Sequence, residues 1–370
     1  MRLLVAVVGA CLLMVVPASA EQPLLGTNGK GRVRVLDPDL KIVPGTPALP
    51  KTTDGTVLSP DGRRFASWSF YGSRLTVRST RTFRAIRTLP IERGTEVFWP
   101  ERDHIVTVDD LNVGKRPNVF RSFDLRSGTS RTVRLRDLLV ETQVVGHRLR
   151  VLTVGGPDLC CPTGPFRVTD ISAAGVVKRR WRVPLPDGFV MGDKFDPIVG
   201  MQLSGTLLLA SQNERHALIK VHSGETKPIA GLGDGYYGWV GRRLISDFRH
   251  IARVDRRAMT VTTVVDTGIE DNTTLFEGGV ILGFGRARYD ANLQRVAQNP
   301  RPAPVQGYRP VLAHGRLYDL IVDCDDSDNT RAAIADAATG AAIAERRGRW
   351  KLGVLGGGYM DQPFFEDVCD

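Results

Sequence analysis

The chain has 370 residues, with 50 lysines and arginines against 40 aspartates and glutamates, so its formal net charge at pH 7 is +10. A single hydrophobic core rarely grows beyond about 250 to 300 residues, so this length indicates either several domains or a repeat architecture. No dense run of lysine and arginine with interleaved aromatic residues marks a nucleic-acid-binding face, which argues against that class of function.

The N-terminus has the pattern of a secretory signal peptide. Arg2 supplies a positive charge, Leu3 to Val16 are almost entirely apolar, and Ala18-Ser19-Ala20 forms a small-residue cleavage site. Cys11 lies inside the apolar run and would be removed with it. No other stretch approaches the roughly 18 consecutive apolar residues of a membrane-spanning helix. The sequence therefore predicts that residues 1–20 are cleaved and that residues 21–370 form a secreted, extracytoplasmic domain.

The first recognisable structural unit covers residues 57–70, VLSPDGRRFASWSF. A Ser-Pro-Asp-Gly corner followed by alternating side chains is typical of two paired antiparallel strands. The same unit, a Gly-marked corner that leads into a strand, recurs along the chain. Further copies start at Val145, Leu203, Val240, Glu277 and Ala313, with weaker ones at Trp99 and Leu352.

A second kind of hairpin alternates with the first. It consists of a strand that ends in Asp, a turn of small residues with a Gly, and another strand. Clear copies contain Asp124 with Gly128, Asp170 with Gly175 and Asp336 with Gly340, and looser copies contain Gly224, Asp255 and Asp290. In such turns the Asp accepts local backbone N–H bonds and the Gly adopts the positive φ that the turn requires. Both residues are therefore expected to be structural.

Each pair of hairpins makes a four-stranded unit, and the corners recur about every 35 to 60 residues. This predicts an all-β fold, a β-propeller of four-stranded antiparallel blades. Residues 32–43 look like a second-kind hairpin without its first half, and residues 352–368 like a first-kind hairpin without its second half. Joined in space, the two ends would complete one blade and close the ring. Seven whole units and one shared unit favour eight blades, and the two weak copies keep seven open.

These motifs resemble a known class of repeat. The SPDGRR corner at residues 59–64 and the D-x-x-x-G turns at Asp124 and Asp336 are similar to WD40-like, TolB-like and YVTN-type propeller repeats. The resemblance covers most of the chain and implies the propeller fold. It implies no one function, because that superfamily includes scaffolds, periplasmic binding components, lactonases and redox enzymes. The Gly-His and Trp-Asp pairs of true WD40 repeats are missing.

Four cysteines remain once the signal peptide is removed, namely Cys160, Cys161, Cys324 and Cys369. In an oxidising compartment an even count suggests disulfides, and four cysteines allow three connectivities. Cys324 ends an apolar run and Cys369 is the penultimate residue, so a bridge between them would pin the tail and stabilise it by about 4 kcal/mol. Cys160 and Cys161 would then be free or joined in a vicinal disulfide.

The adjacent pair Cys160-Cys161 resembles, in that one respect, the vicinal disulfide beside the cofactor of quinoprotein alcohol dehydrogenases, which are eight-bladed propellers. The surrounding Gly- and Pro-rich segment 155–166 favours a rigid exposed loop instead.

The segment VDCDDSDN holds four carboxylates within six residues, Asp323, Asp325, Asp326 and Asp328. Ca²⁺ accepts such oxygen-rich loops. The segment lacks the central Gly and the twelfth-position Glu of an EF-hand loop, so a solvated acidic hairpin tip is the favoured interpretation. A calcium site formed by these four residues is the alternative.

Motifs of catalysis are mostly absent. The chain has no G-x-S-x-G and no H-E-x-x-H motif, and its six histidines show no metal-ligand spacing. No cofactor is predicted apart from the calcium alternative. A propeller can still bring acids and histidines of different blades together at its axis, so the rival hypothesis is a lactonase-like hydrolase or a quinone-linked dehydrogenase.

The favoured function is therefore non-enzymatic. We expect an exported monomeric propeller that binds a protein or an anionic cell-envelope polymer through its loops and one face. A basic exported protein is attracted to anionic polymers, and the aromatic residues Tyr236, Tyr237 and Trp239 could anchor a partner.

Overall fold

The protein is described here from a computed structural model. The structure describes residues 22–28, 31–109, 118–156, 164–190, 200–212, 215–230, 232, 237–240, 243–246, 250–266, 273–275, 281–283, 287–289, 294–298, 311–321, 331–337, 341–356 and 358–359.

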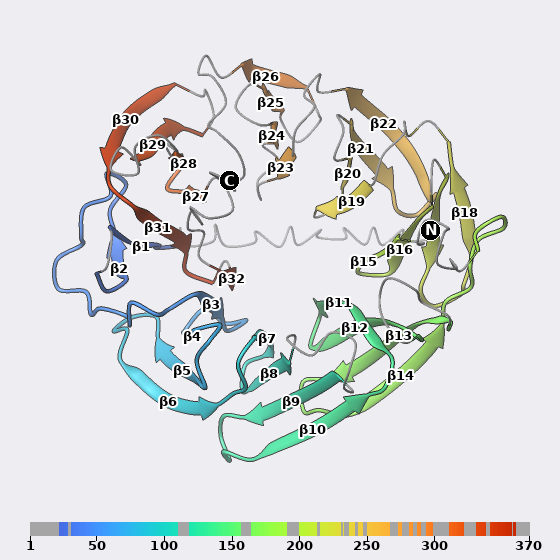
Figure 1. The fold of residues 1–370 in the computed structure, drawn as a ribbon, viewed down its shortest axis with the longest axis horizontal. Helices are drawn as coiled ribbons and strands as arrows, with labels where there is room; N and C mark the ends of the chain where they lie inside the picture. Colours follow the sequence, from blue (N-terminus) through green and yellow to red (C-terminus); the bar gives the residue numbers. More distant parts are fainter. Residues whose placement is uncertain are drawn as a thin grey trace, which may run out of the picture.

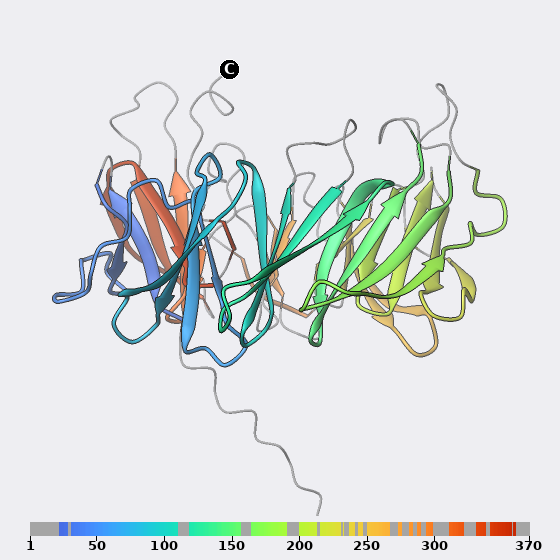
Figure 2. The ribbon, with the colours of Figure 1, turned by 90° about the horizontal axis from the view of Figure 1, so that it is seen from below.

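Within these residues the strands form eight antiparallel sheets. Figure 1 shows the sheets side by side around a ring, and in the sheets built from four consecutive strands the first strand lies nearest the centre and the last on the outside. Seen from the side in Figure 2, the strands run steeply between the two rims of the ring. The all-β propeller predicted from the sequence is confirmed.

Six sheets each consist of four strands that are consecutive in the chain. The first three are β7 (Thr95–Glu101), β8 (His104–Asp109), β9 (Asn118–Asp124) and β10 (Ser130–Leu135); β11 (Leu138–Val145), β12 (Arg148–Val154), β13 (Phe166–Ser172) and β14 (Val177–Arg182); and β15 (Gly200–Ser204), β16 (Leu207–Gln212), β17 (Arg215–Lys220) and β18 (Thr226–Ile229). The next three are β19 (Tyr237–Val240), β20 (Arg243–Ser246), β21 (His250–Asp255) and β22 (Thr260–Asp266); β23 (Thr273–Leu275), β24 (Ile281–Gly283), β25 (Ala287–Tyr289) and β26 (Arg295–Gln298); and β27 (Val311–Ala313), β28 (Arg316–Ile321), β29 (Arg331–Asp336) and β30 (Ala342–Arg347).

The two remaining sheets contain strands from the C-terminal region. One has the order β32 (Gly358–Tyr359), β3 (Gly55–Leu58), β4 (Arg64–Trp68), β5 (Arg74–Ser79) and β6 (Ala85–Pro90). The other, which we call the closing sheet, has the order β2 (Arg34–Leu36), β1 (Leu24–Asn28) and β31 (Trp350–Val354).

The predicted corners form because their side chains satisfy the turn backbone. In the β3–β4 corner the Ser59 hydroxyl donates to Asp61 at 2.7 Å, and Gly62 has a φ of +66°. In the β9–β10 turn Asp124 accepts from the backbone N–H of Arg126 at 2.7 Å, and Gly128 has a φ of +80°. A positive φ is costly for residues with a Cβ, so these glycines fix the turn positions.

One hairpin, β5–β6, carries neither signal. Its turn contains no Gly, and Phe83 itself adopts a φ of +56°. The buried Phe83 ring packs against Phe65 with centroids 5.1 Å apart, and its carbonyl oxygen accepts from Arg78 at 3.2 Å. These contacts therefore stabilise a positive φ at a position where the sequence has no glycine to indicate it.

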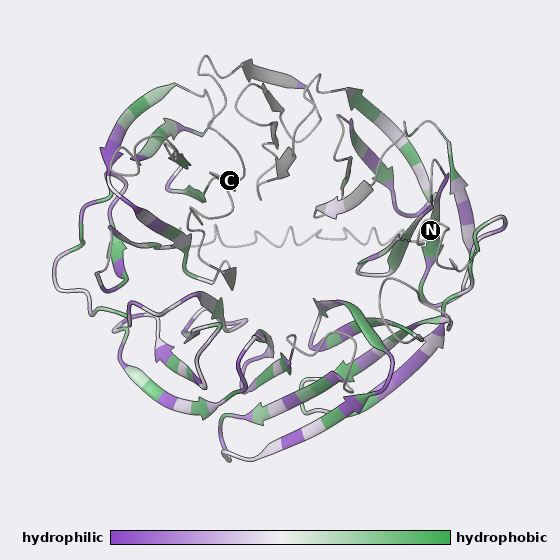
Figure 3. Cartoon of the chain, viewed as in Figure 1, coloured by the Kyte–Doolittle hydropathy of each residue, from purple (hydrophilic) through white to green (hydrophobic). Residues whose placement is uncertain are grey.

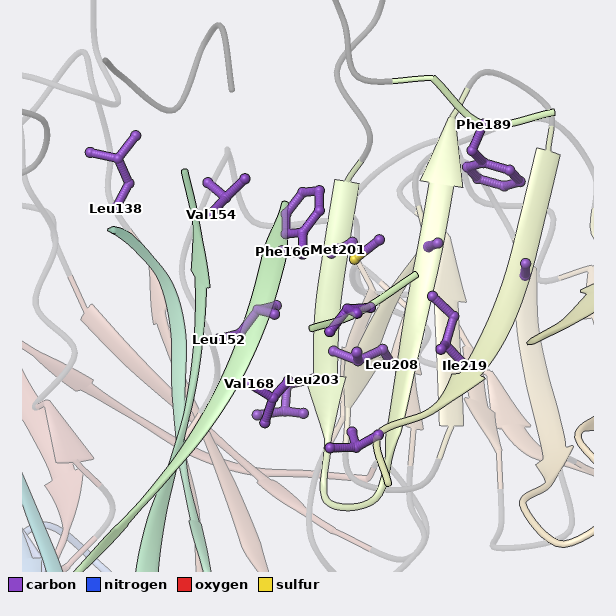
Figure 4. Close-up of a cluster of buried hydrophobic side chains, with 14 residues drawn as sticks. Leu138, Leu152, Val154, Phe166, Val168, Phe189, Met201, Leu203, Leu208 and Ile219 are labelled. Carbon is purple, nitrogen blue, oxygen red and sulfur yellow. The ribbon is translucent and has the colours of Figure 1, made fainter. Parts of the chain in front are cut away.

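The hydrophobic core lies between neighbouring sheets. Where the burial of both strands is described, the second strand of a sheet is more buried than the fourth. β12 and β16 are buried along almost their whole length, whereas β14 and β18 are largely exposed. Figure 4 shows the largest such layer, in which Leu152 and Val168 of one sheet pack near Met201, Leu208 and Ile219 of the next. Each joint between sheets is thus a small hydrophobic core of its own.

The closing sheet joins the two ends of the described chain. Leu24 pairs with Val354 and Asn28 with Trp350, so β1 lies between β31 and β2. The sequence expectation placed residues 32–43 and 352–368 in one blade but did not include β1. It was also wrong in keeping 352–368 together, because β32 leaves the closing sheet and pairs with β3 instead.

A largely buried ion pair links the closing sheet to its neighbour. Lys351 Nζ of β31 lies 2.6 Å from an oxygen of Asp54, just before β3, and the Lys351 residue is 8% exposed. The other Asp54 oxygen accepts from the Ser69 hydroxyl and from Phe70 N–H. Burial raises the pKa of Asp54, but the hydrogen bonds from Lys351 and Ser69 outweigh it, so the pKa is lowered overall.

No helix that could cross a membrane occurs in the described part of the chain.

Replacing Lys351 with Met tests this link. We expect Lys351→Met to lower the free energy of unfolding by about 1 to 3 kcal/mol at neutral pH, because Asp54 loses a charged partner. The lowered pKa of Asp54 contributes stability above its ordinary value of 3.8 that is lost as the pH falls through the folded value. The difference between the two proteins in urea unfolding should therefore shrink under acid conditions. Lys51→Met, at an exposed site, is the control, and equal effects of the two substitutions would refute the link.

Candidate functional site

The residues predicted as a calcium site and as disulfides lie outside the described residues. This applies to Asp323, Asp325, Asp326, Asp328, Cys160, Cys161, Cys324 and Cys369. Tyr236 also lies outside, and of the predicted aromatic anchors only the Trp239 side chain is described. The calcium and disulfide assignments stay predictions.

The described histidines are spread over the ring. His104 lies 3.2 Å from a Glu101 oxygen, and buried His216 shares a hydrogen bond with the Ser211 hydroxyl at 3.1 Å. Within the described ranges, no three His, Cys, Asp or Glu side chains are placed to hold a metal ion together.

Arginine side chains join neighbouring sheets along one rim of the ring. Strand direction alternates within a sheet, so the turns between first and second strands and between third and fourth strands lie at the same end, which we call the turn rim. Three arginines from second strands each donate to a backbone carbonyl oxygen of the next sheet. They are Arg64 to Arg102 at 2.5 Å, Arg150 to Gly205 at 2.7 Å, and Arg316 to Pro38 at 3.0 Å.

Two of these arginines also have a carboxylate partner in the next sheet that fixes the side chain. Arg64 lies 3.0 Å from Asp103 and Arg316 lies 2.7 Å from Asp39. From the opposite direction, Arg256 donates to the Ser204 hydroxyl at 2.8 Å, so the β15–β16 turn is held by both neighbouring sheets. The turn rim is consequently rigid where these arginines lie.

The most buried of these joints centres on Arg150 and Asp170. Both side chains are 0% exposed, with Nε–Oδ1 and Nη2–Oδ2 distances of 2.7 and 2.9 Å. This two-point geometry and the bond from Arg150 to Gly205 repay the cost of removing both charges from water. The sequence expectation that Asp170 accepts local backbone bonds in its turn was wrong, because the carboxylate binds a guanidinium of the neighbouring strand instead.

An open pocket of about 750 Å³ lies beside this pair on the turn rim. Its lining includes Gly146, His147, Arg148, Ser172, Lys178 and Arg179. We call His147, Arg148, Lys178 and Arg179 the basic cluster. They come from the β11–β12 turn and from β14, whose first four residues are exposed. The hydrophilic colouring of β14 in Figure 3 marks its position.

The basic cluster has few compensating charges. Arg148 is 41% exposed and lies 3.2 Å from Asp170, which Arg150 already engages. Lys178 and Arg179 have no ion-pair partner among the described residues. One buried carboxylate therefore serves two guanidinium groups, and a lysine and a third arginine stand beside them. The pocket presents a net positive field to solvent.

The positive charges of this pocket affect the pKa of His222, which lies in the β17–β18 turn of the next sheet. Its ring contacts Trp181 with centroids 4.9 Å apart, and Arg150 lies over the same indole at 5.6 Å. Burial lowers the pKa of His222, and the charges of Arg150, Arg148 and Arg179 lower it further against the opposing effect of Asp170. A bound anion would oppose this effect and raise the pKa.

Comparisons with known proteins support the fold and leave the ligand open. No protein-family model matches the chain, and no curated protein matches it. Among solved structures, the chain resembles a dihydro-heme d1 dehydrogenase, NirN, in complex with DHE, at a TM-score of 0.59 and 13% identity over 94% of this chain and 76% of that one. A structure of a eukaryotic initiation factor overlays at a TM-score of 0.55 and 13% identity, over 92% of this chain and 98% of that one. The chain has the β-propeller fold, and identities this low carry no activity to it.

Sequence reasoning missed the basic cluster, although a signal was present. Residues 178–182 read KRRWR, a short basic run with one tryptophan. Its partners His147 and Arg148 come from a turn earlier in the chain, and only the pairing of β12, β13 and β14 brings them beside it.

Replacing Asp170 with Asn tests the anchor under the site. We expect Asp170→Asn to lower the free energy of unfolding by about 3 to 5 kcal/mol, because Arg150 stays buried without an opposite charge. Urea unfolding monitored by circular dichroism measures this. The matched control is Glu225→Gln, which breaks the exposed Lys220–Glu225 pair and should cost about 0 to 1 kcal/mol. A cost for Asp170→Asn no larger than for the control would contradict the assignment.

Proposed function

We propose that this protein is a non-enzymatic binding module that holds a phosphate-bearing anionic polymer at the basic cluster. The observation that carries the proposal is the charge arrangement of the pocket. Arg148, at the start of β12, and Lys178 and Arg179, of β14, line the pocket, and the neighbouring carboxylate of Asp170 is already bound by Arg150. Such a site gains most from a ligand that brings negative charge.

The chemistry of the cluster favours phosphate. A guanidinium group presents parallel N–H donors that match two oxygens of a phosphate, and a lysine adds a compact charge beside them. The rigid joint of Arg150 to Gly205 and Asp170 holds the floor of the site in place before the ligand arrives. Preorganisation of this kind reduces the entropy lost on binding.

The shape of the site favours a polymer over a small metabolite. The pocket lies open on the turn rim, between exposed turns and an exposed outer strand, so a chain can cross it without being enclosed. Exposed cations raise association rates through long-range attraction, which the positive formal charge of the chain reinforces.

The cellular setting forms part of the proposal. The signal-peptide pattern of residues 1–20 leads us to infer export, with residues 21–370 as a single propeller outside the cytoplasm. Phosphate-bearing envelope polymers and phospholipid surfaces are the anionic ligands of that compartment.

Removing two cations of the cluster tests the function. We expect the double variant Lys178→Gln/Arg179→Gln to bind inorganic polyphosphate about five- to thirtyfold more weakly than the unmodified protein, since two exposed charge contacts contribute about 1 to 2 kcal/mol together. The affinity should also depend less steeply on salt concentration, because fewer counterions are displaced. Isothermal titration calorimetry at several salt concentrations measures both effects.

The matched control is Lys51→Gln/Arg93→Gln, which removes the same charge at exposed positions away from the cluster. The control should bind polyphosphate with nearly unchanged affinity. Equal weakening in both variants would mean that only net charge matters, and the proposed site would be rejected.

A further inference from the structure

The closing sheet has no regular outer strand, unlike the other sheets in the described chain. An irregular segment at residues 42–49 follows the edge of β2 in its place. It makes two backbone bonds to β2 and the residue before it, from Val43 N–H to the Val35 oxygen at 3.0 Å and from Leu49 N–H to the Val33 oxygen at 2.8 Å. These bonds pair backbone groups at the edge of the sheet, but the segment does not cover the sheet with the side chains that a regular fourth strand would supply.

A pocket of about 410 Å³ lies against this sheet, and we call it the edge pocket. Its apolar wall consists of Leu36, Leu40, Ile42 and Trp350. The Trp350 indole N–H already donates to the Arg346 carbonyl oxygen at 3.1 Å, so the ring offers an apolar surface to the pocket. Ile42 is 59% exposed, one of the most exposed large hydrophobic residues described.

Two arginines, Arg32 and Arg34, line the same pocket. Arg34 donates to the Thr46 carbonyl oxygen at 3.1 Å, and neither guanidinium pairs with a carboxylate among the described residues. The nearby carboxylates are engaged elsewhere. Asp37 accepts the backbone N–H groups of Asp39 and Lys41, and Asp39 pairs with Arg316 at 2.7 Å.

We propose that the edge pocket binds a small aromatic carboxylate. The apolar wall would receive the ring, and Arg32 and Arg34 would receive the carboxylate through charge-assisted hydrogen bonds. The volume lies within the range of about 300 to 1,000 Å³ that is typical of small-molecule sites, and such sites combine an apolar lining with a few fixed polar groups. The edge pocket lies on a different sheet from the basic cluster, so this inference does not depend on the proposed function.

Calorimetric titration of the full-length protein with 2-naphthoate tests the proposal, with neutral 2-naphthamide as the matched ligand. We expect saturable binding of one 2-naphthoate per chain, and at least about tenfold weaker binding of the amide, which lacks the charge. Ile42→Asp should weaken 2-naphthoate binding at least about tenfold by placing a like charge in the wall. Arg32→Gln/Arg34→Gln should weaken it about five- to thirtyfold.

The matched variants separate the pocket from nonspecific effects. Ile86 on β6 is 56% exposed, so Ile86→Asp introduces the same charge at a comparable surface position, and Arg81→Gln/Arg84→Gln removes the same positive charge elsewhere. Both controls should bind 2-naphthoate like the unmodified protein, and saturating polyphosphate should leave that affinity unchanged. Absence of binding, equal affinity for the amide, or equal loss in the Ile42 and Ile86 variants would each overturn the proposal.

Discussion

The turn rim of this propeller depends on guanidinium groups that reach from one sheet to the backbone of the next. The guanidinium groups of Arg64, Arg150 and Arg316 each donate a hydrogen bond to a backbone carbonyl oxygen of the neighbouring sheet. A hydrophobic layer alone would hold two sheets together without fixing how their turns lie. Directional, charge-assisted bonds supply that precision, and the buried pair of Arg150 with Asp170 supplies it most strongly.

This constraint separates two kinds of arginine on the turn rim. Arg64, Arg150 and Arg316 are anchored by carbonyl oxygens of the next sheet. Arg148 and Arg179 lie on the same rim and are exposed to solvent, and Arg148 also lies 3.2 Å from the Asp170 carboxylate. The anchored arginines position the turns, and the solvent-facing ones give the rim its charge, so the candidate ligand site is a direct result of how the sheets are joined. The closing sheet follows the same logic, because Arg316 and Lys351 tie it to both of its neighbours.

Much of the fold could be predicted from local turn chemistry. Corners such as Ser59-Pro60-Asp61-Gly62 can be recognised in the sequence because few residue types are compatible with the backbone of a tight turn. The β5–β6 hairpin could not be predicted, since buried contacts of Phe83 replace the usual Gly. Strand β1 was missed although the turn dipeptide Asn28-Gly29 follows its sequence, LLGTN, because its partner β31 lies at the far end of the chain.

The candidate sites were less predictable than the fold. A pattern of sequence shows what one turn contains, but the basic cluster depends on which turns become neighbours. Arg148 and Arg179 meet at one pocket because β12, β13 and β14 pair in a particular register, and His222 joins them from the next sheet. The edge pocket is harder still, because it results from the lack of a regular outer strand in one sheet.

The most direct test of the central claim is the pKa of His222, measured by NMR titration of the histidines with and without polyphosphate. The positive charges around His222 lower its pKa in the free protein. A polyanion held at the basic cluster would favour the imidazolium form, so the account predicts that the pKa of His222 rises on binding. By the same linkage, polyphosphate should bind more tightly as the pH falls through the pKa of His222. Binding of polyphosphate that leaves the pKa of His222 unchanged would contradict the account.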